Sequence, residues 1–270
     1  RNTMGLLSDK RLFVFDMDGT IYLGDRVFPA AVEYISRLRE SGMKVLFFTN
    51  NASHSPEYYV AKLARLGFDP RPGELLTSAD VTIAFLKAHR PGKSVYLVGT
   101  PELEGQFCKS GITLVPTSEV LSGTPADIVV TSFDTTLTYD KLNAACRLIR
   151  QGAEYICTHP DYNCPTEDGF IPDSGSIAAA VTASTGVVPR FFGKPYRETI
   201  DMISELSGVS PAEMCIFGDR LYTDIALGKL NGVTAVLVLT GETKKEDLEK
   251  SDVQPDIVIN SLADAPALTW

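Results

Sequence analysis

Residues 13–20 read Phe-Val-Phe-Asp-Met-Asp-Gly-Thr, a short apolar run followed by two carboxylates on a turn. Consecutive large apolar side chains suit a strand that is buried on both faces, and Gly19 relaxes the turn after it. Placing the like charges of Asp16 and Asp18 together away from water is costly unless a cation or a shared proton compensates them. We interpret the pair as a Mg²⁺ site in which Asp16 is also a nucleophile. The alternative is a solvated turn.

The same alternation of apolar runs and amphipathic stretches continues along the chain. Apolar, β-branched runs predict strands at residues 12–15, 45–48, 94–98, 127–130, 155–157, 214–217, 235–239 and 256–259. Apolar residues at helical spacing predict helices at residues 30–40, 55–66, 79–88, 139–150, 176–185, 197–206 and 224–230. Strands that alternate with helices predict an α/β fold with a parallel sheet flanked by helices.

Composition limits the class of function. The 270 residues carry a net charge of −9 and no basic run, so we expect no nucleic-acid polymer as a partner. The longest apolar runs are far shorter than the roughly twenty residues of a membrane span, and residues 1–10 lack the apolar segment of a secretory signal. The five cysteines form no C-x-x-C pair. We therefore expect a cytoplasmic protein with buried free thiols and no membrane partner.

Polar side chains follow the predicted strand at 45–48. Ligands of a parallel sheet bind beyond the carboxyl ends of its strands, so these residues are candidates for the same site. Thr49, Asn50 and Asn51 offer a hydroxyl and two amides on a loop before a helix, which suits phosphoryl oxygens. Ordinary turn and capping chemistry explains them equally well.

Two later segments add charged residues. Lys194 lies between Gly193 and Pro195. In most proteins a lone lysine is a solvated surface charge, which is the alternative to a role in the site. Asp219 follows the strand predicted at 214–217, and Asp224 comes five residues later at a predicted helix start. Helix capping explains Asp224 by itself, whereas Asp219 at a strand end favours a role in the site.

Taken together and in this order, these segments resemble the haloacid dehalogenase-like (HAD) hydrolase superfamily. The matching motifs are D-M-D-G-T at 16–20, T-N-N at 49–51, G-K-P at 193–195 and G-D-R-L-Y-T-D at 218–224. D-G-T-I-Y, T-N-N and V-L-T-G-E-T are similar to the NagD or 4-nitrophenylphosphatase branch. The resemblance covers nearly the whole chain and implies a Rossmann-like core of residues 1–78 and 187–270, with an inserted α/β cap at 79–186.

The resemblance also implies a chemistry. Asp16 would attack phosphorus and form an aspartyl-phosphate, while Asp18 would protonate the leaving oxygen and then activate water. Lys194 would neutralise charge on the phosphoryl group. Mg²⁺ would be held by Asp16, the backbone carbonyl of Asp18 and Asp219, with Asp224 supporting these ligands or orienting Lys194. The expected activity is hydrolysis of small phosphomonoesters such as sugar phosphates, nucleoside monophosphates or aryl phosphates.

Thr49, Asn50 and Asn51 would bind the phosphate in this scheme, and the cap would choose the leaving group. The loop 158–165 resembles the substrate-specificity region of the branch, so Asp161 and Asn163 are candidate substrate contacts, with a Pro-rich turn as the alternative.

Several questions stay open at this level. Asp173 stands where many relatives carry glycine, which leaves the substrate undecided, and His54 and His159 are candidate acid/base groups that a mechanism with two aspartates does not need. The chain could also be a phosphomutase or a catalytically silent metabolite-binding module, and the branch allows a homodimer through the cap.

Overall fold

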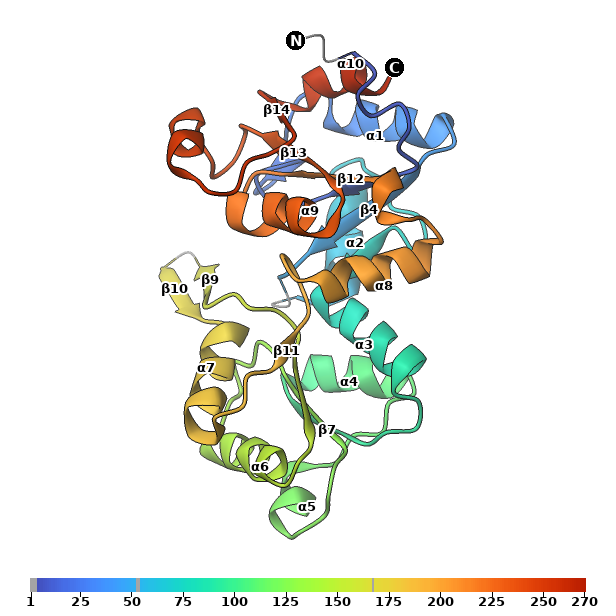
Figure 1. Ribbon diagram of the computed structural model, residues 1–270. Coiled ribbons are helices and arrows are strands. Elements are labelled where there is room, and N and C mark those ends of the chain that lie inside the picture. The colour runs from blue at the N-terminus through green and yellow to red at the C-terminus, as the bar shows by residue number, and fades with distance from the viewer. Residues whose placement is uncertain (1–3, 52–53, 167) are drawn as a thin grey trace. The chain divides into compact units, whose positions relative to one another are not determined.

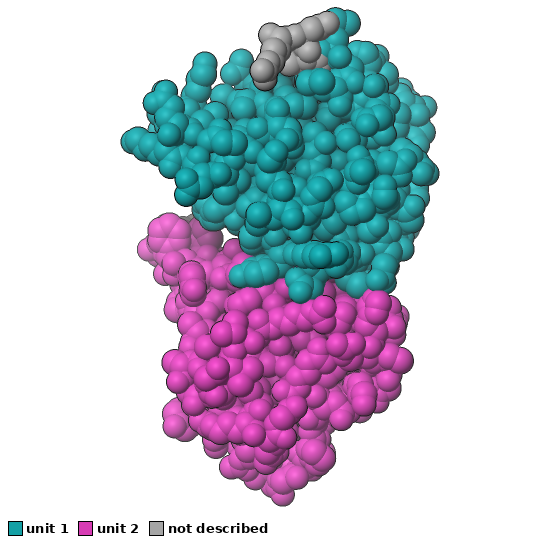
Figure 2. All heavy atoms as spheres, in the orientation of Figure 1, with its two compact units in different colours: residues 1–49, 56–76, 194–270 teal, residues 50–55, 77–193 magenta. Residues whose placement is uncertain are grey.

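The computed structural model describes residues 4–51, 54–166 and 168–270. The chain divides into two compact units, which Figure 2 shows in different colours. The first unit comprises Arg1–Thr49, Pro56–Leu76 and Lys194–Trp270, and the second comprises Asn50–Ser55 and Thr77–Gly193. Each unit combines parallel strands with flanking helices, so the predicted α/β class is confirmed.

The first unit is built around a sheet with strand order β14-β13-β12-β1-β4-β5. Its strands are β1 (Leu12–Phe15), β4 (Lys44–Thr49), β5 (Leu75–Thr77), β12 (Met214–Gly218), β13 (Thr234–Val238) and β14 (Ile257–Ile259). The strands from β14 to β4 pair in parallel. A small antiparallel hairpin of β2 (Tyr22–Leu23) and β3 (Arg26–Val27) follows β1. The strands expected from unbroken apolar runs are therefore present.

Helices cover both faces of this sheet. They are α1 (Ala31–Glu40), α2 (Pro56–Arg65), α8 (Arg197–Ser207), α9 (Ala226–Asn231) and α10 (Ala265–Thr269), with 3₁₀ turns at Pro211–Glu213, Lys245–Lys250 and Leu262–Asp264. Figure 1 shows α1 and α10 on one side of the sheet and α8 and α9 on the other. Phe15 packs with Tyr34 of α1 and stacks on Phe217 with ring centroids 5.0 Å apart. This aromatic packing fixes the central strands.

The register of the sheet decides which strand ends meet. Phe15 of β1 lies opposite Phe47 of β4 and Phe217 of β12. Because all three strands run in the same direction, the residues that follow them emerge at one edge. Asp16, Thr49 and Asp219 come within two residues of those paired positions, so the predicted strand-end site has a structural basis.

The second unit has its own parallel sheet, with strand order β11-β8-β7-β6. Its strands are β6 (Val95–Val98), β7 (Ile128–Thr131), β8 (Glu154–Cys157) and β11 (Arg190–Phe191), and β9 (Asn163–Thr166) forms an antiparallel hairpin with β10 (Gly169–Pro172). Its helices are α3 (Ser78–His89), α4 (Pro101–Lys109), α5 (Thr117–Leu121), α6 (Tyr139–Arg150) and α7 (Ser174–Thr185). Leu148 of α6 and Val181 of α7 pack on Val129 in a separate core.

The structure differs from the sequence predictions at several places, and short elements such as α5, α10, β5 and β11 are not predicted. Helix α4 is not predicted because only Leu103 and Phe107 form its buried stripe, although Thr100 caps it and Pro101 begins it. The loop expected at 158–165 becomes strand β9 from Asn163 onward.

Asp224 does not begin an α-helix, because it lies in a π-helical turn, Leu221–Ile225, that precedes α9.

The five cysteines are free thiols. Four of them are buried, but Cys108 is exposed, so the expectation of buried thiols is wrong for this residue. Cys108 follows the buried Phe107 on α4 and therefore turns to the solvent side of that helix. None of the helices in the described part of the chain combines the length and apolar character needed to cross a membrane.

Candidate active site

Lys194 joins two carboxylates at the carboxyl edge of the first unit's sheet. Its Nζ donates to Asp16 Oδ1 at 2.8 Å and to Asp224 Oδ1 at 2.6 Å. The lysine is 4% exposed, and its ammonium lies 5.7 Å from the ring centroid of Phe48. Burial alone would lower the pKa of Lys194, but Asp16 and Asp224 outweigh that effect and raise it. The ammonium is therefore a permanent positive charge beside Asp16, not a surface lysine.

Asp219 joins the same group. One ligand atom from each of Asp16, Asp219 and Asp224 lies within 4.8 Å of the others. Burial and the neighbouring charge of Asp16 raise the pKa of Asp219 and of Asp224, since each carboxylate is harder to ionise beside another. The three side chains thus form an acidic cluster that a bound cation would stabilise.

Backbone close to Asp219 holds its carboxylate. A Cβ on Gly19, whose φ is +84°, would lie 2.3 Å from Asp219 Oδ2, and one on Gly241 would lie 2.0 Å from it. Only a residue without a side chain fits at either position. Glu242 N–H donates to the same oxygen at 2.8 Å. The carboxylate is therefore packed between two stretches of backbone.

The donor set fits a divalent metal. Three carboxylates that converge at a strand edge, with no sulfur ligand among them, are typical of a hard cation that prefers oxygen. The cluster contains the predicted ligands Asp16 and Asp219 and adds the carboxylate of Asp224, whereas the ligand predicted from Asp18 is its backbone carbonyl and not its side chain.

Asp18 lies beside the cluster on the solvent side. It is exposed, and Gly24 N–H donates to its carboxylate. Partial desolvation raises the pKa of Asp18, and Asp16 raises it further, although Lys62 acts in the opposite direction. A carboxyl group with a raised pKa next to a partly buried carboxylate suits proton transfer.

The predicted phosphate-binding residues are divided between the units. Thr49 is the last residue of β4 and is buried, which places its hydroxyl at the edge where Asp16 emerges. Asn50 is buried and Asn51 is partly exposed, and both belong to the second unit.

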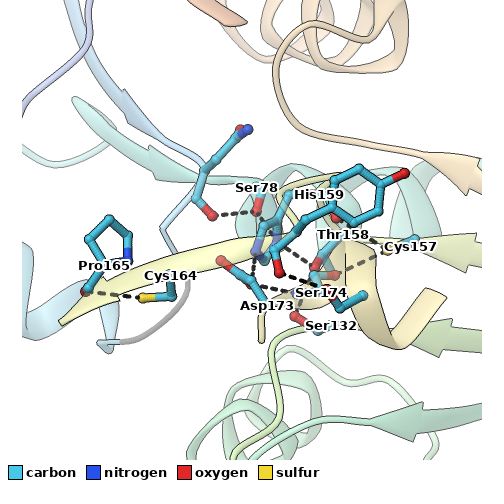
Figure 3. A network of polar contacts seen from close by, with 12 residues as sticks. Ser78, Ser132, Cys157, Thr158, His159, Cys164, Pro165, Asp173 and Ser174 are labelled. Atoms are coloured by element: carbon cyan, nitrogen blue, oxygen red, sulfur yellow. Dashed lines mark hydrogen bonds and ion pairs between the residues drawn. The ribbon is translucent and has the colours of Figure 1, made fainter. Parts of the chain in front are cut away.

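A second polar cluster surrounds His159 in the second unit (Figure 3). The imidazole is completely buried, with Nε2 2.8 Å from Asp173 Oδ1 and Nδ1 2.9 Å from Thr158 Oγ1. Ser78 Oγ lies 3.3 Å from Nδ1. Burial lowers the pKa of His159, yet Asp173 outweighs it and the net shift is upward. His159 has no solvent exposure, whereas His54 is exposed.

Backbone hydrogen bonds connect the segment 158–165, the candidate substrate-specificity loop, to the start of α7. Asp173 caps that helix by accepting from Ser174 N–H, and its own N–H donates to Tyr162 O at 2.9 Å. Gly175 N–H donates to Asp161 O at 2.8 Å. These bonds use backbone atoms. The Asp161 carboxylate lies within 4.8 Å of ligand atoms of His159 and Asp173, and Asn163 is exposed.

The His159–Asp173 pair makes stability depend on pH. Because the folded pKa of His159 lies above its ordinary value of 6.5, the pair's contribution is complete below that value and is lost as pH rises through the folded pKa. Asp173→Asn keeps a capping oxygen but removes the charge. We expect it to lower the free energy of unfolding by about 1.5–3 kcal/mol in mildly acidic buffer and by less in alkaline buffer.

Urea unfolding of both proteins across this pH range measures the difference. Asp134→Asn is the matched control, because Asp134 is a buried carboxylate of the same unit that pairs with Lys141 at 2.8 Å and not with a histidine. A deficit of Asp173→Asn that grows with pH would contradict the assignment.

Sequence reasoning missed the loop after β13. Thr240 and Glu242 belong to the V-L-T-G-E-T motif, which indicated the NagD-like branch but was not predicted to contribute to the site. Thr240 Oγ1 donates to Gly19 O at 2.7 Å, and Glu242 contacts Asp219 as described above. The glycine between them, directly after a predicted strand, is the signal that could have identified the loop.

Comparison with known proteins agrees with this geometry. A family profile described as haloacid dehalogenase-like hydrolase matches residues 13–113, and one described as HAD-hydrolase-like matches residues 191–265. An acid sugar phosphatase of Staphylococcus aureus (strain MRSA252) is 35% identical over 259 residues, which is 95% of this chain and 97% of that protein. The chain belongs to the haloacid dehalogenase-like hydrolase family. The family predicted from the motifs is therefore confirmed.

Solved structures place the chain within that family. A 4-nitrophenylphosphatase from Thermotoga maritima is 43% identical, with a TM-score of 0.87 and coverage of 98% of this chain and 99% of that one. A putative NagD protein is 44% identical, with a TM-score of 0.78 and coverage of 92% and 96%. The predicted NagD-like branch, the HAD core with a cap and the phosphatase class are confirmed.

Proposed function

We propose that this phosphatase hydrolyses small phosphomonoesters, sugar and aryl phosphates included, with Mg²⁺ and through a phosphoryl group carried on Asp16. The observation that carries the proposal is the contact of Lys194 with both Asp16 and Asp224 inside the acidic cluster. A buried cation next to a carboxylate at a strand end suits a nucleophile that must approach an anionic ester. The names of the relatives support the two ester classes.

Each residue has a definite task in this reaction. An oxygen of Asp16 attacks phosphorus, the bond from phosphorus to the ester oxygen breaks, and Asp18 gives that oxygen its proton. Asp18 then takes a proton from water, which attacks phosphorus and releases inorganic phosphate and the Asp16 carboxylate. Lys194 neutralises charge throughout. Mg²⁺, held by Asp16, the Asp18 carbonyl and Asp219, supplies further charge neutralisation when bound.

The second unit is proposed as the cap that selects the leaving group. Asp161 and Asn163 lie on a segment that backbone hydrogen bonds hold at the start of α7, and we propose both as substrate contacts. Thr49, Asn50 and Asn51 are proposed to bind phosphoryl oxygens. Free thiols support the proposal that the protein works in the cytoplasm.

A panel of esters tests the activity. Phosphate release is measured with sugar phosphates, nucleoside monophosphates and 4-nitrophenyl phosphate, in Mg²⁺ and after treatment with EDTA. We expect release that disappears with EDTA and returns with Mg²⁺. Phosphoryl transfer to a second sugar hydroxyl without release would indicate a mutase, and no turnover of any ester would indicate a binding module.

Asp18→Asn distinguishes the two steps of the reaction. With sugar phosphates we expect turnover to fall by about 10²–10⁴-fold, because an alkoxide needs a proton to leave. With 4-nitrophenyl phosphate the leaving group departs without one, so the variant should release one nitrophenol per site in a burst and then turn over slowly. Stopped-flow absorbance measures the burst, and Asp16→Asn, which cannot be phosphorylated, is the control. A variant that turns over 4-nitrophenyl phosphate at the wild-type rate without a burst would count against Asp18 as the base that activates water.

Asp219→Asn tests the cation site. Asparagine keeps an oxygen for Glu242 N–H and removes one of three clustered charges, so we expect the metal-free variant to melt at a higher temperature than the wild type. Mg²⁺ at 100 times its Kd should stabilise the wild type by about 2.7 kcal/mol and the variant by less than about 0.5 kcal/mol. Thermal melts with and without Mg²⁺ measure both effects, with Asp201→Asn on the exposed side of α8 as control. An equal Mg²⁺ response in the Asp219 variant would exclude this site.

A further inference from the structure

Both carboxylate oxygens of Glu242 are engaged by residues of one turn. Arg220 Nε lies 2.8 Å from Oε2, and Tyr222 Oη donates to Oε1 at 2.8 Å. Arg220 and Tyr222 follow directly after β12, whereas Glu242 belongs to the loop after β13. The three side chains, here called the Glu242 clamp, therefore tie the loops after two adjacent strands together.

The backbone next to the clamp holds Asp219. Glu242 N–H donates to Asp219 Oδ2 at 2.8 Å, and Thr243 N–H donates to Asp219 O at 3.1 Å. Gly241 packs so closely that a Cβ there would lie 2.0 Å from Asp219 Oδ2. Any displacement of this loop therefore moves the Glu242 N–H and the Gly241 backbone, which together set the orientation of the Asp219 carboxylate.

The positive charge of Arg220 does not explain why this residue lies beside a predicted cation site. The guanidinium interacts electrostatically with Asp16 and Asp219, and a positive charge near a cation site opposes the binding of a cation. Its ion pair with Glu242 offers a reason for its position. Both side chains of the pair are partly exposed, at 40% and 47%, so burial does not hold them and the clamp depends on its mutual contacts.

We propose that Glu242, held by Arg220 and Tyr222, is a positioning residue that keeps the Asp219 carboxylate in the orientation a divalent cation needs. The inference rests on the proposed function, because it assumes that the acidic cluster binds Mg²⁺. Residues that orient metal ligands without touching the metal characteristically change metal affinity when they are removed.

Calorimetric titration with Mg²⁺ tests the inference without any substrate. We expect Glu242→Ala to raise the Kd for Mg²⁺ by about tenfold or more, and Tyr222→Phe to raise it by a smaller factor in the same direction. At saturating Mg²⁺ the kcat of both variants should return to within about threefold of the wild type, because the ligands themselves are intact. Lys229→Met is the matched control, since Lys229 forms a similarly exposed ion pair with Asp256 on the same unit.

Two further outcomes separate positioning from charge. Tyr222→Phe changes no charge. An unchanged Kd in this variant, together with a raised Kd in Glu242→Ala, would show that Glu242 affects Mg²⁺ binding only through its charge, and would overturn the inference. Arg220→Met removes a positive charge, and we expect weaker binding in spite of that, whereas tighter binding would also overturn it. A wild type that binds no Mg²⁺ would refute the proposed function instead.

Discussion

Asp16→Asn is expected to lower phosphate release by at least about 10⁴-fold with every ester, because the variant has no nucleophile to receive the phosphoryl group. The local structure should survive. Asparagine matches aspartate in size, the Asp16 backbone N–H still donates to Phe217 O at 3.0 Å, and Lys194 keeps its contact with Asp224. Initial rates at saturating Mg²⁺ measure the loss, and thermal melts show that the variant is folded.

An acid-quench experiment identifies the nucleophile directly. During turnover the wild type should carry a phosphoryl group on the peptide that contains Asp16, and Asp16→Asn should carry none. Asp201→Asn, an exposed aspartate on α8, is the control and should behave as the wild type in both measurements. Turnover within tenfold of the wild type in the Asp16 variant would exclude the covalent route.

Lys194→Met is expected to destabilise the metal-free protein by about 3–5 kcal/mol at neutral pH and to abolish activity. Methionine has a similar length, but the change leaves Asp16 and the fully buried Asp224 without the ammonium that contacts both. The cost should be smaller in acid, because the raised pKa of Asp224 lets that carboxyl group take up a proton and lose its charge.

Urea unfolding in EDTA at neutral and acid pH measures this cost. The double variant Lys194→Met/Asp224→Asn should recover part of the loss, since the two side chains are in contact and their effects are not additive. Lys229→Met removes an exposed ion pair and should cost no more than about 1 kcal/mol. A loss of that small size in Lys194→Met would show that the buried pairing is unimportant for stability.

Local sequence patterns are enough to predict the main buried strands of both sheets and the residues that follow them. Apolar runs such as 12–15 and 214–217 are local signals, because a strand buried on both faces needs no polar side chain along its length. The strands of a parallel sheet end at a common edge, so Asp16, Thr49 and Asp219 could be assigned to one site before any contact was known.

Which charged side chains pair depends on contacts between segments that are far apart in the sequence. Lys194 reaches Asp16 across 178 positions of sequence. Asp224 adds a third carboxylate to the cluster, because the π-helical turn after β12 brings it beside that lysine. The same holds for His159 with Asp173. Hydrophobic periodicity indicates which face of a helix or strand is buried. A contact between two side chains depends on sheet register and turn geometry, and no local sequence pattern specifies these.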